Sequence, residues 1–121
     1  MFDTPSSPKP RIRILIGDTV ALGPGKVRLL EAIEQTGSIA AAARAMGMSY
    51  GRAWQLVRAM NGDFVSPLVQ REAGGRGGGG ASVTDLGRDA LTRYREIERT
   101  AGAAVEAEVA EFSELLKAVT E

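Results

Sequence analysis

Cysteine and histidine are both absent from the 121 residues of this sequence. Without cysteine the chain can form no disulfide bond and has no thiol nucleophile, which fits a reducing cytoplasm. Without histidine as well, an ordinary structural zinc site and a Ser-His-Asp triad are excluded. The carboxylates that remain are expected on solvated helix faces, so we predict no enzyme activity, no metal and no cofactor.

Long apolar runs are missing too. No segment reaches the roughly 18 consecutive apolar residues of a transmembrane helix, and the opening stretch MFDTPSSPKPRI lacks the apolar core of a signal peptide. We therefore expect a cytoplasmic protein with no membrane partner. The length suits one domain with an extension, and residues 1–10, which hold three prolines and two serines, are predicted to be a disordered arm.

The net charge of zero hides an uneven distribution of charge along the chain. Residues 1–95 hold 13 basic and 8 acidic side chains, whereas residues 96–121 hold 2 basic and 7 acidic ones. Binding to phosphate requires local positive charge and not a basic average. The neutral total is therefore poor grounds for excluding a nucleic-acid partner.

The central stretch GSIAAAARAMGMSYGRAWQLVRAMN has the pattern of two short helices joined by a tight turn. Ser38 can cap the first helix, because its hydroxyl can accept a hydrogen bond from a free backbone N–H of the first turn. Gly47 suits the positive φ at which many helices end. Ser49 can cap a second helix, which is predicted to run from Tyr50 to about Asn61. Two helices joined in this way form the helix-turn-helix, whose second helix enters the DNA major groove.

The second of these helices has two different faces at the helical period. The face expected to pack on the domain is apolar and comprises Ala53, Leu56, Val57 and Met60. Arginine can bond guanine in a bidentate way and glutamine can bond adenine. We therefore predict that base edges are read by Ser49, Tyr50, Arg52 and Gln55, that Gly51 lets the backbone approach the duplex, and that Arg58 holds a phosphate. The alternative is a packed helical hairpin whose polar face is merely solvated.

The segment before this motif is predicted to contain a strand and a helix. The alternating apolar residues of Arg11–Ile16 favour a strand. Residues 18–23 suit either an extension of that strand into a hairpin or a loop. Pro24 can occupy the first position of a helix, where its missing N–H costs nothing, and this helix should continue to about Thr36.

After the motif, two short strand-like segments, Leu68–Glu72 and Ala81–Val83, flank a run of glycines. A strand, a flexible loop and a strand directly after a recognition helix make the wing of a winged helix-turn-helix. Arg71 and Arg76 are predicted to reach phosphate from this wing. The glycines also satisfy G-x-G-x-x-G, but a strand-like segment follows where the dinucleotide fingerprint needs a helix, so we do not expect nucleotide binding.

From Thr84, a suitable N-cap, the chain is predicted to form one long helix over residues 85–121. Apolar side chains recur along it every three or four residues: Leu91, Tyr94, Ile97, Ala101, Val105, Val109, Phe112 and Leu116. A stripe of this length on a small domain favours pairing with a second subunit over burial on the domain itself. The alternative is an amphipathic helix that folds back on its own domain.

The motif S-Y-x-x-A-W at Ser49–Trp54, the glycine-rich wing and the T-x-x-G that follows it resemble the N-terminal domain of ModE-type molybdate-responsive transcription regulators, which is related to the LysR-type winged helix. The resemblance covers roughly residues 11–99. It implies a homodimer that reads a palindromic operator. It places the family's DNA contacts at the Ser49-Tyr50 start of the second helix, on its Arg52 and Gln55 face and on the wing that holds Arg76. Together with the residues predicted above, the full set of expected DNA contacts is Ser38, Ser49, Tyr50, Gly51, Arg52, Gln55, Arg58, Arg71 and Arg76.

The sequence also departs from this family. Full-length members carry a pair of small C-terminal β-barrel domains that bind molybdate at a dimer interface, and this chain ends at Glu121 without such a barrel. No residue pattern in this sequence singles out a pocket for an oxyanion or a small-molecule effector.

The sequence thus predicts a mainly α protein with a small β wing: a winged helix-turn-helix over residues 11–84, followed by a dimerisation helix. Its expected partners are double-stranded DNA and a second copy of the chain. The predicted function is transcription regulation on a palindromic operator, with molybdate-related genes implied by the resemblance. The alternative is a winged-helix module that binds proteins and does not read DNA.

Overall fold

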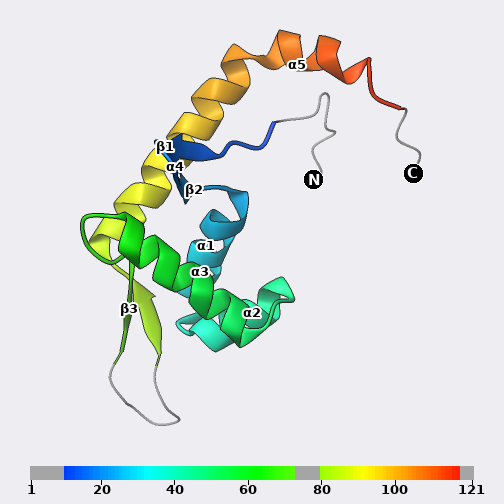
Figure 1. Cartoon of the computed structure of the whole chain (residues 1–121). Coiled ribbons are helices and arrows are strands. Elements are labelled where there is room, and N and C mark those ends of the chain that lie inside the picture. Colours follow the sequence, from blue (N-terminus) through cyan, green and yellow to red (C-terminus); the bar gives the residue numbers. More distant parts are fainter. Residues whose placement is uncertain (1–9, 73–79, 118–121) are drawn as a thin grey trace.

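The computed structural model describes residues 10–72 and 80–117. It is mainly helical, as predicted, and contains two small antiparallel strand pairs, one of which is the predicted wing (Figure 1). The predicted arm lies outside the described residues except for Pro10, and so do most of the glycine run and Arg76. The elements in chain order are β1 (Ile14–Ile16), β2 (Thr19–Leu22), α1 (Pro24–Thr36), α2 (Ile39–Met46), α3 (Tyr50–Asp63), β3 (Val69–Arg71), β4 (Ala81–Val83), α4 (Asp85–Ala104) and α5 (Glu106–Ser113).

The N-terminal strands form a hairpin, which settles the alternative left open by the sequence. β1 pairs with β2 through a turn in which Gly17 has a φ of 62°. β1 is shorter than the predicted strand, because residues 11–13 carry no strand pairing. This hairpin lies beside α4 in Figure 1, and the hydroxyl of Tyr94 in α4 donates a hydrogen bond to the carbonyl of Ile12.

The local signals of the central motif are all realised. Ser38 Oγ accepts a hydrogen bond from Ala41 N–H at 3.0 Å, and Ser49 Oγ accepts one from Arg52 N–H at 3.0 Å. Gly37 ends α1 and Gly47 ends α2 in the left-handed region, with φ of 74° and 70°. These caps satisfy backbone groups that a helix end leaves free, so the two turns are fixed by local chemistry.

The core lies between the three helices of the domain, the wing and the first half of α4. Small side chains on α2 and α3 allow the two helices to approach closely, since Ala42 and Ala53 are fully buried. Every element except β1 and α5 contributes to the core, whose other side chains are Leu22, Val27, Leu29, Leu30, Ile33, Ile39, Ala43, Val57, Met60, Leu68, Val69, Ala81, Val83, Leu91 and Tyr94.

Two residues of the predicted dimer stripe belong to this core. Leu91 is only 8% exposed and Tyr94 only 1% exposed, so neither side chain is available to a second subunit. Burial is also the main reason why the pKa of the Tyr94 phenol is raised. The prediction that these two residues contact a partner is therefore wrong, and α4 uses its first half to complete its own domain.

The C-terminal segment is not one continuous helix, which corrects the prediction. α4 ends at Ala104, and Val105 has a φ of −110° and a ψ of 14° that interrupt the helix before α5. Beyond this point no described side chain of the segment is buried. Helices in proteins owe most of their stability to packing of an apolar face, and this support is missing once the chain has left the domain.

The wing is joined to α4 by a dense set of contacts around Thr84. The Thr84 side chain donates a hydrogen bond to the Pro67 carbonyl at 2.8 Å and accepts one from Gly87 N–H at 3.0 Å. The backbone of Gly87 passes against the start of β3, so a Cβ atom there would overlap the Leu68 carbonyl oxygen and lie 2.6 Å from Val83 Cγ1. The first turn of α4 can therefore approach the wing this closely only with glycine at position 87.

We expect Gly87→Ala to destabilise the protein by about 1–3 kcal/mol, because an added methyl group in a packed site forces neighbouring atoms to move. The matched control is Gly102→Ala in the same helix, where a Cβ atom meets nothing within 4 Å. That change should be neutral or stabilise the helix by about 0.5–1 kcal/mol. Urea unfolding followed by circular dichroism measures both, and equal stability of the two variants would contradict the packing argument.

Candidate nucleic-acid interface

The polar face of α3 is exposed as the sequence predicts. Ser49, Tyr50, Gly51 and Arg52 at its N-terminal end and Gln55 and Arg58 further along are all classed as exposed, whereas Ala53, Val57 and Met60 on the other side are buried completely. Leu56 is only half-buried. The N-terminal end of α3 is therefore open to contact while its apolar face holds it on the domain.

The wing is fastened to the far end of α3 by one side-chain amide. Asn61 Oδ1 accepts hydrogen bonds from Leu68 N–H at 2.9 Å and Val69 N–H at 3.1 Å, and its Nδ2 donates one to the Val69 carbonyl at 3.0 Å. Sequence reasoning identified Asn61 only as a helix end. No local pattern marked this role, because its partners lie seven and eight residues further along the chain.

A second contact holds the wing against the turn between α1 and α2. Ala81 N–H donates a hydrogen bond to the Gly37 carbonyl at 2.9 Å. A Cβ atom at Gly80 would lie 2.8 Å from that same carbonyl oxygen, so the last glycine of the run is needed for close approach. The wing is thus placed beside both α2 and α3.

Arg71 of β3 reaches across to α3. Its guanidinium carbon lies 4.7 Å from the centre of the Trp54 ring, within range of a cation–π interaction, and Nη2 lies 3.4 Å from the Tyr50 hydroxyl oxygen. Trp54 is half-buried and packs against the core. The structure adds a contact that the sequence did not indicate: this ring also supports a wing arginine.

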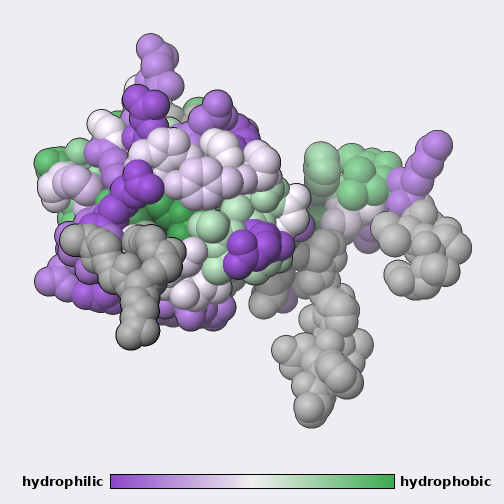
Figure 2. Space-filling model, turned by 90° about the horizontal axis from the view of Figure 1, so that it is seen from below, coloured by the Kyte–Doolittle hydropathy of each residue, from purple (hydrophilic) through white to green (hydrophobic). Residues whose placement is uncertain are grey.

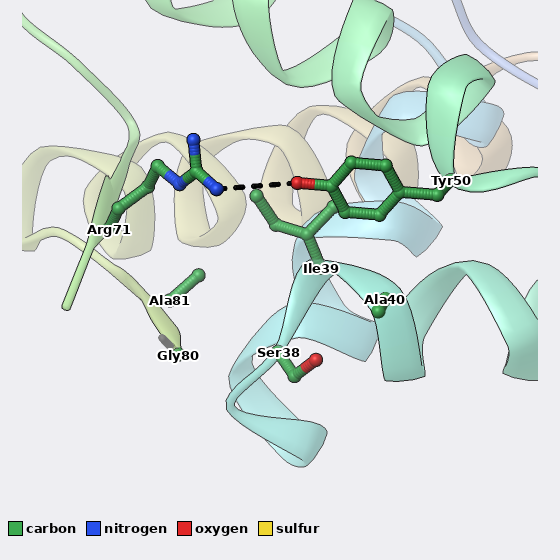
Figure 3. A pocket seen from close by; sticks show the side chains of 7 residues that line it. All are labelled: Ser38, Ile39, Ala40, Tyr50, Arg71, Gly80 and Ala81. Atoms are coloured by element: carbon green, nitrogen blue, oxygen red, sulfur yellow. Dashed lines mark hydrogen bonds between the residues drawn. The ribbon is translucent and has the colours of Figure 1, made fainter. Parts of the chain in front are cut away.

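A small open cavity lies where α2, α3 and the wing meet (Figure 3). Its volume is about 60 Å³. Figure 3 shows Arg71 from the wing and Tyr50 from α3 pointing toward one another across Ile39. We call this cavity the notch, and it is lined by Ser38, Ile39, Ala40, Tyr50, Arg71, Gly80 and Ala81.

The arginines of this region have no acidic partner among the described residues. Every ion pair within the described residues involves a cation of α1 or α4, namely Lys26, Arg88, Arg93, Arg95 or Arg99. Arg44, Arg52, Arg58 and Arg71 are exposed and form no ion pair in the part of the chain that the structure describes. Figure 2 looks onto the side of the wing, where hydrophilic side chains project around a smaller apolar area. The positive charge on this side is therefore free to meet an anionic partner.

The structure thus brings most of the predicted DNA contacts to one side of the domain. Ser38 caps α2 and lines the notch, Tyr50 and Arg71 meet across it, and the remaining residues lie on the exposed part of α3. Arg76 lies outside the described residues. Within the described part of the chain, no group of three or more potential metal ligands gathers, and no helix is long and apolar enough to cross a membrane.

Several curated proteins are similar in sequence to this chain. The molybdenum transport protein ModE of Azotobacter vinelandii is 49% identical over 78 residues, which cover 64% of this chain and 29% of the relative. The transcriptional regulator ModE of Haemophilus influenzae is 38% identical over 89 residues, 74% of this chain and 35% of the relative. The DNA-binding transcriptional dual regulator ModE of Escherichia coli K12 is 39% identical over 71 residues, 59% of this chain and 27% of the relative. The chain spans about a third or less of the length of these relatives.

A solved structure shares the fold of this chain, and a family model matches more than half of its sequence. The DNA-binding domain of CbnR in its complex with DNA superposes with a TM-score of 0.53 at 24% identity, covering 69% of this chain and 91% of that one, which shows a shared winged-helix fold. Residues 25–88 match the family described as bacterial regulatory helix-turn-helix protein, lysR family. The resemblance to ModE-type regulators is confirmed by the relatives named above, and the chain belongs to the lysR family of bacterial regulatory helix-turn-helix proteins.

Proposed function

We propose that this chain binds double-stranded DNA and regulates transcription in the cytoplasm, as a homodimer on a palindromic operator. The observation that carries the proposal is the exposed N-terminal end of α3 with the wing fixed beside it and unpaired arginines on both. A helix-turn-helix presents its second helix to the major groove in this way. The names of the relatives, which include transcriptional regulators and molybdenum transport proteins, support a role in molybdenum-related gene control.

The exposed residues divide into base readers and phosphate contacts. Arg52 lies in the first turn of α3 and Gln55 lies about one turn further on, so both can reach base edges if the helix enters the groove by its N-terminus. Arg58 lies further from that end and is suited to a backbone phosphate, as is Arg71 on the wing. Gly51 adds no side chain that would hold the helix away from the duplex.

The proposed dimer uses the apolar residues that the domain leaves uncovered. Figure 2 shows a green area on the C-terminal segment that projects from the domain. The exposed large apolar side chains of α4 and the segment after it are Ile97, Val105, Phe112, Leu115 and Leu116. Ala101 and Val109, from the predicted stripe, are half-buried. Removal of these side chains from water by a second copy would stabilise the dimer. A palindromic operator is matched by a protein with two-fold symmetry.

We expect Arg52→Ala to weaken binding to a preferred duplex by about ten- to a hundredfold and to relax preference at one base pair, because a bidentate base contact is lost. Arg58→Ala should weaken all duplexes similarly and lower the slope of log affinity against log salt by about 1. The control is Arg93→Ala on α4, whose arginine is paired with Asp89 away from the interface. The preferred duplex is first selected from a random pool, and affinities are then measured at several salt concentrations.

Failure of the wild-type chain to bind any duplex in dilute buffer would overturn the proposal. The winged-helix module that binds only proteins would then be the better interpretation. Equal losses on preferred and random duplexes for Arg52→Ala would leave DNA binding in place but remove the base-reading role.

We expect Phe112→Glu to shift the chain from dimer to monomer, because a charge would be placed in the apolar contact. Sedimentation equilibrium measures the change, with Glu111→Gln as the control on the neighbouring exposed position. Affinity for a full palindrome should fall, while affinity for a single half-site should stay the same. A wild-type chain that is monomeric at micromolar concentration would contradict this dimer.

A further inference from the structure

The hydroxyl of Tyr50 is directed toward the wing (Figure 3). Tyr50 is the first residue of α3 and is 45% exposed, so its position alone suggests a base contact. Its hydroxyl oxygen instead lies 3.4 Å from Arg71 Nη2, and Figure 3 shows the ring directed across the notch toward the wing. Tyr50 thus shares the notch with a cation, which calls for a different role from that of Arg52.

The polar groups that line the notch can donate hydrogen bonds, and none of the described residues that line it is acidic. Arg71 brings a guanidinium with no carboxylate partner among the described residues. Tyr50 accepts the bond from Arg71 and Ser38 Oγ accepts one from Ala41 N–H, so each hydroxyl still has its own hydrogen to donate. Donor groups that converge from three separate elements on one cavity form a site for an anion.

The neighbouring glutamate does not neutralise this site. Glu72 follows Arg71 along the wing strand, and successive side chains of a strand point to opposite faces. Its Oε2 accepts a hydrogen bond from the Ser82 hydroxyl at 2.5 Å, which holds the carboxylate on the other side of the wing. The cavity of about 60 Å³ is also several times the 10–15 Å³ or so that a single ordered water needs, so it can admit a larger group.

Trp54 restricts the guanidinium that serves this site. The planar group lies over the indole ring at 4.7 Å from its centre. An arginine side chain without such a contact loses much rotamer freedom when it binds a ligand. Because the ring already favours one orientation, less entropy is lost when an anion arrives. The arginine is therefore preorganised for a contact at a fixed place between α3 and the wing.

We propose that the notch is the binding site for one phosphate group of the DNA backbone, held by Arg71, Tyr50 and Ser38. Tyr50 therefore contacts the backbone and not a base edge. This inference rests on the DNA binding proposed above and assigns one phosphate of each half-site to one cavity. DNA is the favoured source of the phosphate because the notch adjoins the exposed end of α3 and the free arginines of the same side.

The test replaces the phosphates of a selected duplex one at a time with neutral methylphosphonates. With the wild-type chain, one position in each half-site should cost about tenfold in affinity, the loss of a hydrogen-bonded contact to a charged group. With Arg71→Gln the same replacement should cost almost nothing, because the charged partner of the phosphate is gone. With Tyr50→Phe it should cost clearly less than in wild type, because one hydrogen bond of the contact is gone. Arg52→Gln is the matched comparison: it lowers affinity through the bases and should keep the full penalty at that phosphate.

The outcomes separate this inference from the function on which it rests. A duplex that binds well, but for which each methylphosphonate costs the same affinity in wild type as in Arg71→Gln and Tyr50→Phe, would overturn the notch as a phosphate-binding site and leave DNA binding intact. A change of base preference in Tyr50→Phe would show that Tyr50 contacts a base edge and would overturn the assignment. Absence of binding to any duplex would overturn both proposals.

Free phosphate is the other source of the same chemistry, and it is tested directly. Trp54 is the single tryptophan of the chain and lies under Arg71, so its fluorescence reports on the notch. Titration with inorganic phosphate should give no saturable change at millimolar concentration if the site is built for a DNA backbone. A saturable change in wild type that is lost in Arg71→Gln would make the notch a site for a free oxyanion and overturn the assignment to DNA.

Discussion

The arrangement of the interface depends on the three hydrogen bonds that Asn61 makes with the first residues of the wing. Backbone groups at a half-buried position need partners, and one amide side chain satisfies three of them here. Tyr50, Trp54 and Asn61 are spaced by four and seven residues, so they lie in one stripe along α3. Because Asn61 fixes the start of β3 at one end of this stripe, the strand runs back along it and Arg71 meets Trp54 and Tyr50 at the other end.

The basic residues of the domain serve two different purposes. Those of α4 are engaged by carboxylates: Arg95 binds Glu31 of α1 at 2.8 Å, and Arg88 lies 3.5 Å from Glu34. These pairs are solvent-exposed and add little to stability, but they fix α4 against α1 and neutralise its positive charge. The arginines on α2, α3 and the wing have no such partners in the described residues, so their positive charge adds to the field at this side of a neutral protein.

Local chemistry made much of this fold predictable from the sequence, and distant contacts made the rest unpredictable. Ser38, Gly47 and Ser49 act on the backbone within four residues of themselves, so the helix-turn-helix and its exposed face followed from spacing alone. The three contacts of Asn61 and the stacking of Arg71 on Trp54 join separate elements, and no periodicity encodes them. The break at Val105 was missed for a related reason: apolar periodicity continues past it, but the packing that would sustain a helix does not.

The link between α4 and the wing determines how the proposed dimer would act on DNA. Thr84 caps α4 and bonds the carbonyl of Pro67, and Gly87 lies against Leu68, so the base of the wing is held directly against the first turn of α4. Tyr94 and Arg95 extend these contacts to the hairpin and to α1. The orientation of α4 therefore sets the orientation of the notch and of α3. The break at Val105 lies beyond all of these contacts, so in the proposed dimer a change in the direction of the chain after Val105 would alter the spacing of the two α3 helices and leave the contacts that hold each α3 and its wing unchanged.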